Sequence, residues 1–306
     1  MGYGMYSIDA HRALTTSRAK APREAVFRQR KCHPLMDPKG LRVRESRDSE
    51  AHPHSLGIVL ALDVTGSMGQ IPHDLATRDL PAFVGLLEQI RVEDPQVLFM
   101  AVGDATSDRA PLQVGQFESE AGLMDQWLTS SFLEGGGGGS FQESYELAMY
   151  VAARHTSMDC WEKRRRRGYF FLTGDELPYA GVSRIEVERL IGDELADDVP
   201  IERIVDELSV AYEPFFLIPD LSRVQRCGGR WRELLGDQVI PLALPEDICP
   251  TAALVVALGQ GAIADLSGAE AVLKKVGVTE RRRVARILRA LEPYAESPTR
   301  AAEAAE

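Results

Sequence analysis

The sequence predicts an α/β fold: a doubly wound, mostly parallel sheet with helices on both faces and one short antiparallel edge strand. Two observations lead to this fold class. The apolar runs 57–63, 97–102 and 169–173 are continuous rather than alternating, which is typical of parallel strands buried on both faces. Between these runs lie segments whose apolar residues recur at helical spacing, and such alternation of strands with helices produces βαβ units.

The remaining elements follow from the same patterns in chain order. The alternation of polar and apolar residues at 41–45 and at 112–117 predicts edge strands, the second of them antiparallel. Two further strands are expected at 214–218 and 238–242. Helices are predicted at 72–90, where Pro81 should introduce a kink, and at 123–128, 142–155, 182–191, 201–210, 221–235 and 246–261.

The elements from residue 41 to residue 262 form one predicted domain. The arm 1–40 is basic and irregular, and 263–306 is expected to be a helical extension with a disordered tail. Residues 1–56 carry 11 Lys or Arg and 6 Asp or Glu, a net charge of +5. Since the whole chain has a net charge of −11, the other residues carry −16, which argues against a broad nucleic-acid-binding face.

The sequence also predicts the cellular location of the protein. No apolar run approaches the ~20 residues needed to cross a bilayer, and the amino terminus has no signal-peptide pattern. The cysteines are far apart and show no paired spacing, which predicts reduced thiols: Cys32, Cys160, Cys227 and Cys249. We therefore expect a cytoplasmic protein without a membrane span.

An oxygen-rich motif follows the first buried strand. The run 57–62 ends on Asp63, and Thr65 and Ser67 follow at alternate positions. Parallel sheets bind ligands at the carboxyl ends of their strands, so these side chains lie where a site is expected. Hard oxygen ligands that include one carboxylate suit Mg²⁺, or alternatively Ca²⁺ or Mn²⁺, better than copper or zinc.

Two more strand-to-helix loops are expected to converge on this motif. The glycine run 135–139 leads to the second group of oxygen-bearing side chains, Ser140, Glu143 and Ser144. Asp175 follows the buried strand 169–173. The combination of three such loops predicts a metal site far more specifically than a five-residue motif alone.

Asp63-Val64-Thr65-Gly66-Ser67 resembles the Asp-x-Ser/Thr-x-Ser signature of von Willebrand factor A domains, whose metal-ion-dependent adhesion site (MIDAS) holds a divalent cation. The resemblance implies a threonine ligand from the second loop and an aspartate, here Asp175, from the third. No threonine lies between Gly135 and Glu146, so Glu143 or Ser144 must substitute, with Ser140 as an outside candidate. A carboxylate at 143 would favour a permanently bound, structural ion.

The resemblance also implies a function without catalysis. In the family the metal keeps one position open for an acidic side chain of a partner protein. Intracellular bacterial members commonly act as adaptors of AAA+ ATPases, which makes a MoxR-type ATPase the expected partner. The alternative is a scaffold whose metal is structural and whose basic arm 1–40 binds the partner.

A third hypothesis is phosphoryl transfer through an aspartyl phosphate. The motif at Asp63 also resembles that of cation-pumping ATPases in the haloacid dehalogenase-like superfamily, and Asp175 could serve its Mg²⁺ loop. That chemistry needs a lysine, and the only one between Met68 and Gly168 is Lys163, inside the basic run 163–167. Two other side chains are weaker candidates for a role in the site. His73 is expected to face solvent from a helix, and Asp104 is expected to line the rim of the site or to cap a turn.

Overall fold

The computed structural model describes residues 21–134 and 141–297, together with positions 7, 9, 13, 14, 16 and 18. Most of the arm before residue 21, the glycine run 135–139 with Ser140, and the tail after Ser297 therefore lie outside the described residues.

A six-stranded sheet forms the centre of the molecule, in the order β12-β11-β7-β2-β3-β4. All neighbours pair in parallel except β3 and β4, which are antiparallel. This arrangement confirms the predicted fold class. The strands span Leu56–Asp63 (β2), Pro95–Val102 (β3), Leu112–Val114 (β4), Gly168–Thr173 (β7), Tyr212–Ile218 (β11) and Val239–Pro241 (β12).

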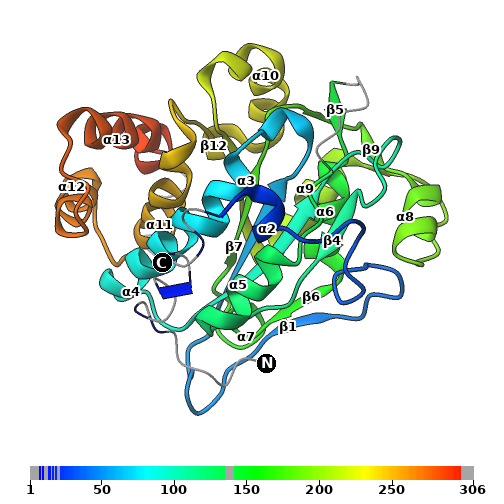
Figure 1. Cartoon of the computed structure of the whole chain (residues 1–306), viewed down its shortest axis with the longest axis horizontal. Coiled ribbons are helices and arrows are strands. Elements are labelled where there is room, and N and C mark those ends of the chain that lie inside the picture. The colour runs from blue at the N-terminus through cyan, green and yellow to red at the C-terminus, as the bar shows by residue number, and fades with distance from the viewer. Residues whose placement is uncertain are drawn as a thin grey trace.

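Helices cover both faces of this sheet (Figure 1). Leu80–Gln89 (α4) packs with Ile248–Gly259 (α11) on one face, and Tyr145–Arg154 (α6) packs with Ile201–Ala211 (α9) on the other. The apolar strand and helix faces share one large hydrophobic cluster. Further helices are Arg23–Val26 (α2), Ala121–Thr129 (α5), Asp159–Glu162 (α7), Arg184–Leu190 (α8) and Val224–Leu235 (α10).

The segment predicted as one helix at 72–90 is divided. It consists of Ile71–Asp74 (α3), a π-helical turn at Leu75–Asp79, and α4. Pro81 lies in the first turn of α4, where the N–H that proline lacks is least needed. In the π-helical turn before it, the Leu80 N–H donates to the Leu75 carbonyl, and this turn divides the segment where one continuous helix was predicted.

Three short ladders lie outside the central sheet and were not predicted. The strand expected at 41–45 is displaced to Arg44–Ser46 (β1) and pairs in parallel with Thr156–Met158 (β6). The helix expected from residue 142 begins only at Tyr145, because Gln142–Glu143 (β5) pairs with Leu177–Pro178 (β8). Gly181–Val182 (β9) pairs with Val199–Pro200 (β10).

The C-terminal helices Leu266–Lys275 (α12) and Arg281–Ala295 (α13) pack onto α11 and join the same hydrophobic cluster. The Tyr294 and Phe215 rings form a T-shaped contact with 5.0 Å between centroids, and the Tyr294 hydroxyl donates to Glu213 at 3.2 Å. Nowhere in the described ranges is a helix long and apolar enough to cross a membrane.

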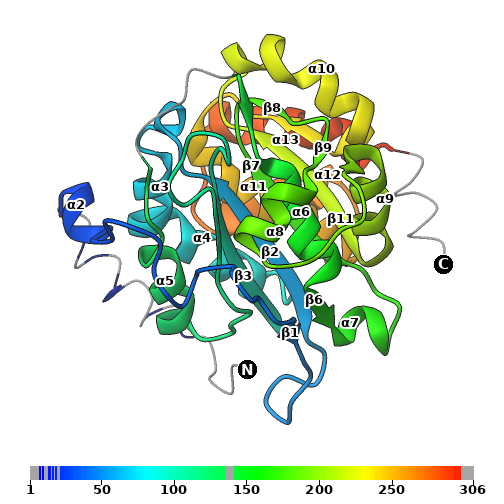
Figure 2. The same cartoon turned by 90° about the vertical axis from the view of Figure 1, so that its right-hand side faces the viewer.

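The N-terminal segment, here residues 21–29 with α2, lies near α3 and the end of α5, on the side of the molecule away from α9 (Figure 2). The Arg23 guanidinium donates to the Gly69 carbonyl at 3.3 Å, and His73 Nε2 lies 3.2 Å from the Ala21 carbonyl oxygen. His73 is therefore largely covered, with 15% of its side chain exposed, and the prediction that it faces solvent is wrong. The sequence pattern could not show this because the covering segment is distant along the chain.

Candidate metal centre

The sheet order places two of the predicted loops where the winding of the chain reverses. Counted within the central sheet alone, the order is 3-2-1-4-5-6, so the first and fourth strands, β2 and β7, are neighbours. Asp63 is the last residue of β2, and Asp175 lies two residues beyond β7. Open α/β sheets bind their ligands in the crevice at this point of reversal.

Hydroxyl groups connect the two carboxylates. Asp63 Oδ1 accepts hydrogen bonds from the Thr65 N–H at 2.8 Å and from Thr65 Oγ1 at 2.6 Å. Thr65 Oγ1 lies 3.1 Å from Ser67 Oγ, which donates to Asp175 Oδ1 at 2.8 Å. The turn closes at Gly69, whose φ of +52° strongly favours glycine. The first and third predicted loops thus meet through contacts between side-chain oxygens.

Tyr145, which was not predicted, joins the second loop to this group. Its hydroxyl donates to Asp63 Oδ2 at 2.6 Å and accepts from the backbone N–H of Asp175 at 3.3 Å. Gly174 leaves room for this hydroxyl, because a Cβ atom there would collide with it. The sequence could have indicated this role, because Tyr145 lies only two residues after Glu143, the expected ligand of the second loop.

The two remaining second-loop candidates have different surroundings. Glu143 is buried, and its Oε2 has no hydrogen-bond partner among the described residues. Ser144 is also buried, but its hydroxyl oxygen accepts from the Ala105 N–H at 2.9 Å, in the loop after β3. The β5–β8 pairing places Glu143 opposite Pro178, three residues beyond Asp175.

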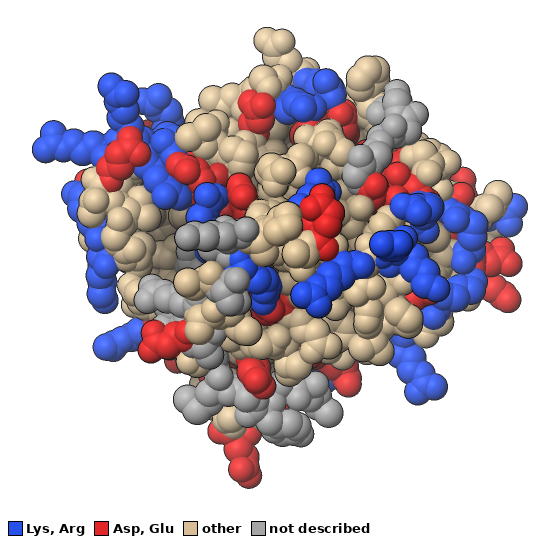
Figure 3. Space-filling model, in the orientation of Figure 1, with Lys and Arg blue, Asp and Glu red and all other residues tan. Residues whose placement is uncertain are grey.

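Two arginines at the start of α10 face the third loop, one just before the helix and one inside it. Arg223, the residue before the helix, places Nη1 2.9 Å from Asp175 Oδ2. Arg226 pairs with Glu176, and its guanidinium lies 5.1 Å from the centre of the Phe141 ring. Positive and negative side chains lie next to one another over α10 in the space-filling view (Figure 3). The parallel topology could have suggested Arg223, since it follows β11 at the same sheet edge.

Burial disfavours the charged carboxylates of this centre. Burial, with a smaller contribution from the charge of Asp175, raises the pKa of Asp63 to about 7, although Thr65 and Tyr145 donate to it. Burial and the neighbouring charge of Asp63 raise the pKa of Glu143 to about 9. A bound cation would relieve both effects, since an opposite charge nearby favours the ionised form.

The donor set fits a hard divalent cation. Carboxylates and hydroxyls are the ligands that Mg²⁺ and Ca²⁺ prefer, and the buried Glu143 Oε2 is an acceptor without a donor in the described chain. Within residues 21–134 and 141–297, no cluster of three or more His, Cys, Asp or Glu side chains could hold a metal by itself. The side-chain oxygens that meet here include the hydroxyls of Thr65 and Ser67 as well as the carboxylates.

The other candidates lie outside this group of contacts. Asp104 caps its own turn, accepting from the Thr106 N–H at 2.9 Å and also from the Tyr179 hydroxyl at 2.9 Å. Lys163, the lysine that phosphoryl transfer would need, pairs with Asp159 at 2.7 Å and with Asp48 at 3.3 Å. Both oxygens of the buried Asp63, the would-be nucleophile, accept hydrogen bonds.

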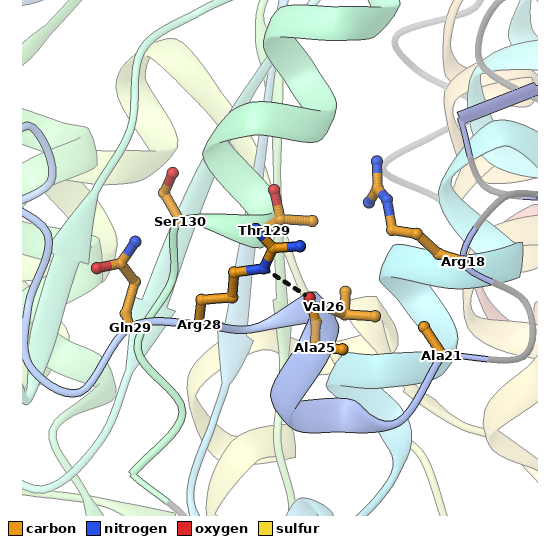
Figure 4. A pocket seen from close by; sticks show the side chains of 8 residues that line it. All are labelled: Arg18, Ala21, Ala25, Val26, Arg28, Gln29, Thr129 and Ser130. Carbon is orange, nitrogen blue, oxygen red and sulfur yellow. Dashed lines mark hydrogen bonds between the residues drawn. The ribbon is translucent and has the colours of Figure 1, made fainter.

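Two surface pockets differ in their relation to the centre. A pocket of about 270 Å³ lies directly beside it, lined by Ser67 and Asp175 as well as by Arg223 and Asp220. A larger one, of about 540 Å³, lies between the N-terminal segment and the end of α5 and contains Arg18 and Arg28 (Figure 4). Arg28 donates to the Ala25 carbonyl at 3.0 Å, and none of the predicted metal ligands lines this second pocket.

Comparison with known proteins leaves the family unassigned. No protein-family model and no curated protein matches the chain. The pilus adhesin SpaC from Lactobacillus rhamnosus GG, in its open conformation, is 11% identical with a TM-score of 0.47, over 71% of this chain and 31% of the adhesin. Proximal thread matrix protein 1 from the mussel byssus, with a zinc-occupied MIDAS motif, is 10% identical with a TM-score of 0.41.

The alignment with the mussel protein covers 74% of this chain and 51% of the mussel chain. This chain thus spans about a third of the adhesin and half of the matrix protein. The strand order and the parallel pairing of the central sheet establish the fold independently of these likenesses.

Replacing Glu146 by Gln should stabilise the protein at alkaline pH. Glu146 lies buried on α6, its Oε2 has no partner among the described residues, and burial raises its pKa to about 8. Below about pH 4.5 the Glu146 carboxyl is protonated in the folded and the unfolded chain, and its ionisation costs no stability. As the pH rises from 4.5 towards 8, only the unfolded chain releases this proton readily. The free energy of unfolding therefore falls, by up to about 4 kcal/mol.

Urea unfolding of Glu146→Gln in EDTA should therefore show a gain over the wild type at pH 8.5 and little difference at pH 4.5. The exposed Glu188 on α8 provides the control, since Glu188→Gln should change stability equally little at both pH values. An equal gain for Glu146→Gln at both values would contradict the expected ionisation.

Proposed function

We propose that the chain binds one divalent cation, with Mg²⁺ the expected ion, and uses the loaded site to bind another protein. The proposed ligands come from the three loops: Asp63, Thr65, Ser67, Glu143 and Asp175, with Ser144 as the other second-loop candidate. The observation that carries the proposal is the run of oxygen contacts from Asp63 through Thr65 and Ser67 to Asp175. This run lies at the strand ends where α/β sheets bind ligands.

The bound cation would supply a Lewis-acidic position for a carboxylate of the partner. Mg²⁺ commonly keeps part of its coordination shell open to water, so protein ligands need not fill it. The pocket of about 270 Å³ beside Ser67 and Asp175 provides space for a partner side chain to reach this position. Tyr145 would hold Asp63 and the third loop in place through its hydroxyl.

Glu143 is the better second-loop ligand, because its free acceptor is buried whereas the Ser144 oxygen already accepts from Ala105. Glu143→Gln should weaken Mg²⁺ binding at least about tenfold, since it removes a charge from the ligand set. Ser144→Ala should change the affinity less than about threefold. Isothermal titration of both variants with Mg²⁺ checks this, and the reverse ranking would assign the ligand to Ser144.

The partner that the resemblance implies, a MoxR-type AAA+ ATPase in the cytoplasm, remains a prediction. The scaffold alternative, in which the metal is structural and the arm 1–40 binds the partner, makes a different prediction about metal removal. If the site binds the partner, EDTA releases it; if the arm does, binding persists without metal.

The deciding experiment is affinity capture from a lysate with the full chain in Mg²⁺, with parallel samples in EDTA and with Asp63→Ala. Captured proteins are identified by mass spectrometry, and each is then purified and titrated under the same conditions. Partner binding lost in both EDTA and Asp63→Ala would support the proposed function. A partner that binds equally under all conditions would refute metal-dependent binding and favour the scaffold.

A further inference from the structure

Arg223 occupies an unusual position beside the proposed metal site. It lies between β11 and α10, and its guanidinium crosses to the loop after β7, where Nη1 lies 2.9 Å from Asp175 Oδ2. The other oxygen of the same carboxylate, Oδ1, accepts from Ser67 Oγ. Asp175 thus faces the metal ligands with one oxygen and a resident positive charge with the other.

We propose that Arg223 competes with the divalent cation for Asp175 and so keeps the affinity of the site low. This inference rests on the proposed function, because it concerns the same site. A guanidinium in contact with a metal ligand repels an incoming cation and already compensates part of the negative charge that attracts it. The side chain is only 29% exposed, so water screens this repulsion less than it would on an open surface.

The pocket beside the site can accommodate the Arg223 side chain after a cation has displaced it from Asp175. Arg223 lines the pocket of about 270 Å³, and two carboxylates besides Asp175 line it too: Asp220 and Asp74. When a cation takes over Asp175, the guanidinium can turn towards Asp220 without losing a counter-charge. Occupancy of the site then depends on the cation concentration, in contrast to the permanently bound ion that a carboxylate at 143 alone would favour.

Arg226 provides a matched control one helical turn away. It has the same charge, lies three positions further along the chain in α10 and pairs with the neighbouring Glu176. The acid that it contacts is not a proposed ligand. A general effect of net charge near the site would act on both arginines, whereas competition for Asp175 concerns Arg223 alone.

Mn²⁺ binding to the full chain, measured by isothermal titration and by the Mn²⁺ electron paramagnetic resonance signal, tests the inference. Arg223→Gln should bind Mn²⁺ about tenfold more tightly than the wild type. Arg226→Gln should stay within about threefold of it. Arg223→Lys keeps the charge but loses the planar fork, and should fall between the wild type and Arg223→Gln.

A purely structural role for Arg223 predicts the opposite sign, because loosening the third loop weakens binding. If a folded Arg223→Gln or Arg223→Lys chain, checked by circular dichroism, binds Mn²⁺ no more tightly than the wild type, the inference is overturned. The cation binding in the proposed function would still stand if the wild type bound Mn²⁺ and Asp63→Ala did not. If neither the wild type nor the Arg223 variants bind Mn²⁺, both the proposed function and the inference fail.

Discussion

Asp63→Ala should abolish divalent-cation binding, with a loss of affinity of more than about 100-fold. Asp63 is the charged residue of the first loop, and both its carboxylate oxygens are oriented by neighbours: Thr65 donates to Oδ1 and Tyr145 to Oδ2. Its removal takes away the charge and leaves these donors without their acceptor. The measurement is titration with Mg²⁺ and Mn²⁺, together with the rise in Tm that saturating Mg²⁺ produces through binding to the folded state.

The control for this variant is His73→Ala. His73 lies near the motif along the chain, but its ring contacts the Ala21 carbonyl, so its removal should leave the metal affinity intact. If Asp63→Ala and His73→Ala have the same effect on metal binding, the proposed site is wrong.

A second variant, Asp63→Asn, distinguishes loss of metal binding from loss of folding. The raised pKa of Asp63, about 7, means that the metal-free protein loses stability as the pH rises from about 4 to 7. Asp63→Asn removes this ionisation while retaining the shape of the side chain. In EDTA at pH 8 it should therefore unfold at a urea concentration no lower than the wild type, yet gain nothing from Mg²⁺.

Trp231→Ala should have the largest effect on stability, about 3–5 kcal/mol. Trp231 is fully buried on α10, where its ring stacks on Phe216 with 3.9 Å between centroids and lies 5.7 Å from Tyr145. Its indole N–H also donates to the Glu176 carbonyl at 3.0 Å, in the loop that carries Asp175. Truncation leaves a cavity under the metal centre and removes a support of its third loop.

Urea unfolding followed by far-UV circular dichroism measures this loss without relying on the fluorescence of the residue removed. Trp231→Phe keeps a ring in the cavity and loses the hydrogen bond, so it should cost much less, roughly 1–2 kcal/mol. Trp127→Phe, at a half-buried position on α5, is the control for a tryptophan away from the site. A loss below about 1 kcal/mol for Trp231→Ala would contradict the packing described here.

Local sequence patterns were sufficient for the central sheet. The runs at 57–63, 97–102 and 169–173 correspond to β2, β3 and β7. A strand that is apolar on both faces has no side suited to solvent, so it is buried between layers of helices. The same patterns failed for short elements such as β5 and β6. Two- and three-residue strands have no periodicity of their own and exist only where a partner strand lies nearby.

Some contacts of the candidate site could likewise be predicted from the sequence, and others could not. The order of residues along the chain was enough to predict that Asp63, Thr65 and Ser67 lie at the end of one strand and that Asp175 follows another. The hydrogen bond from Tyr145 to Asp63 and the ion pair of Arg223 with Asp175 became visible only in the folded chain. These contacts join residues dozens of positions apart, and their choice of partner depends on how helices pack against the sheet, which no local pattern encodes.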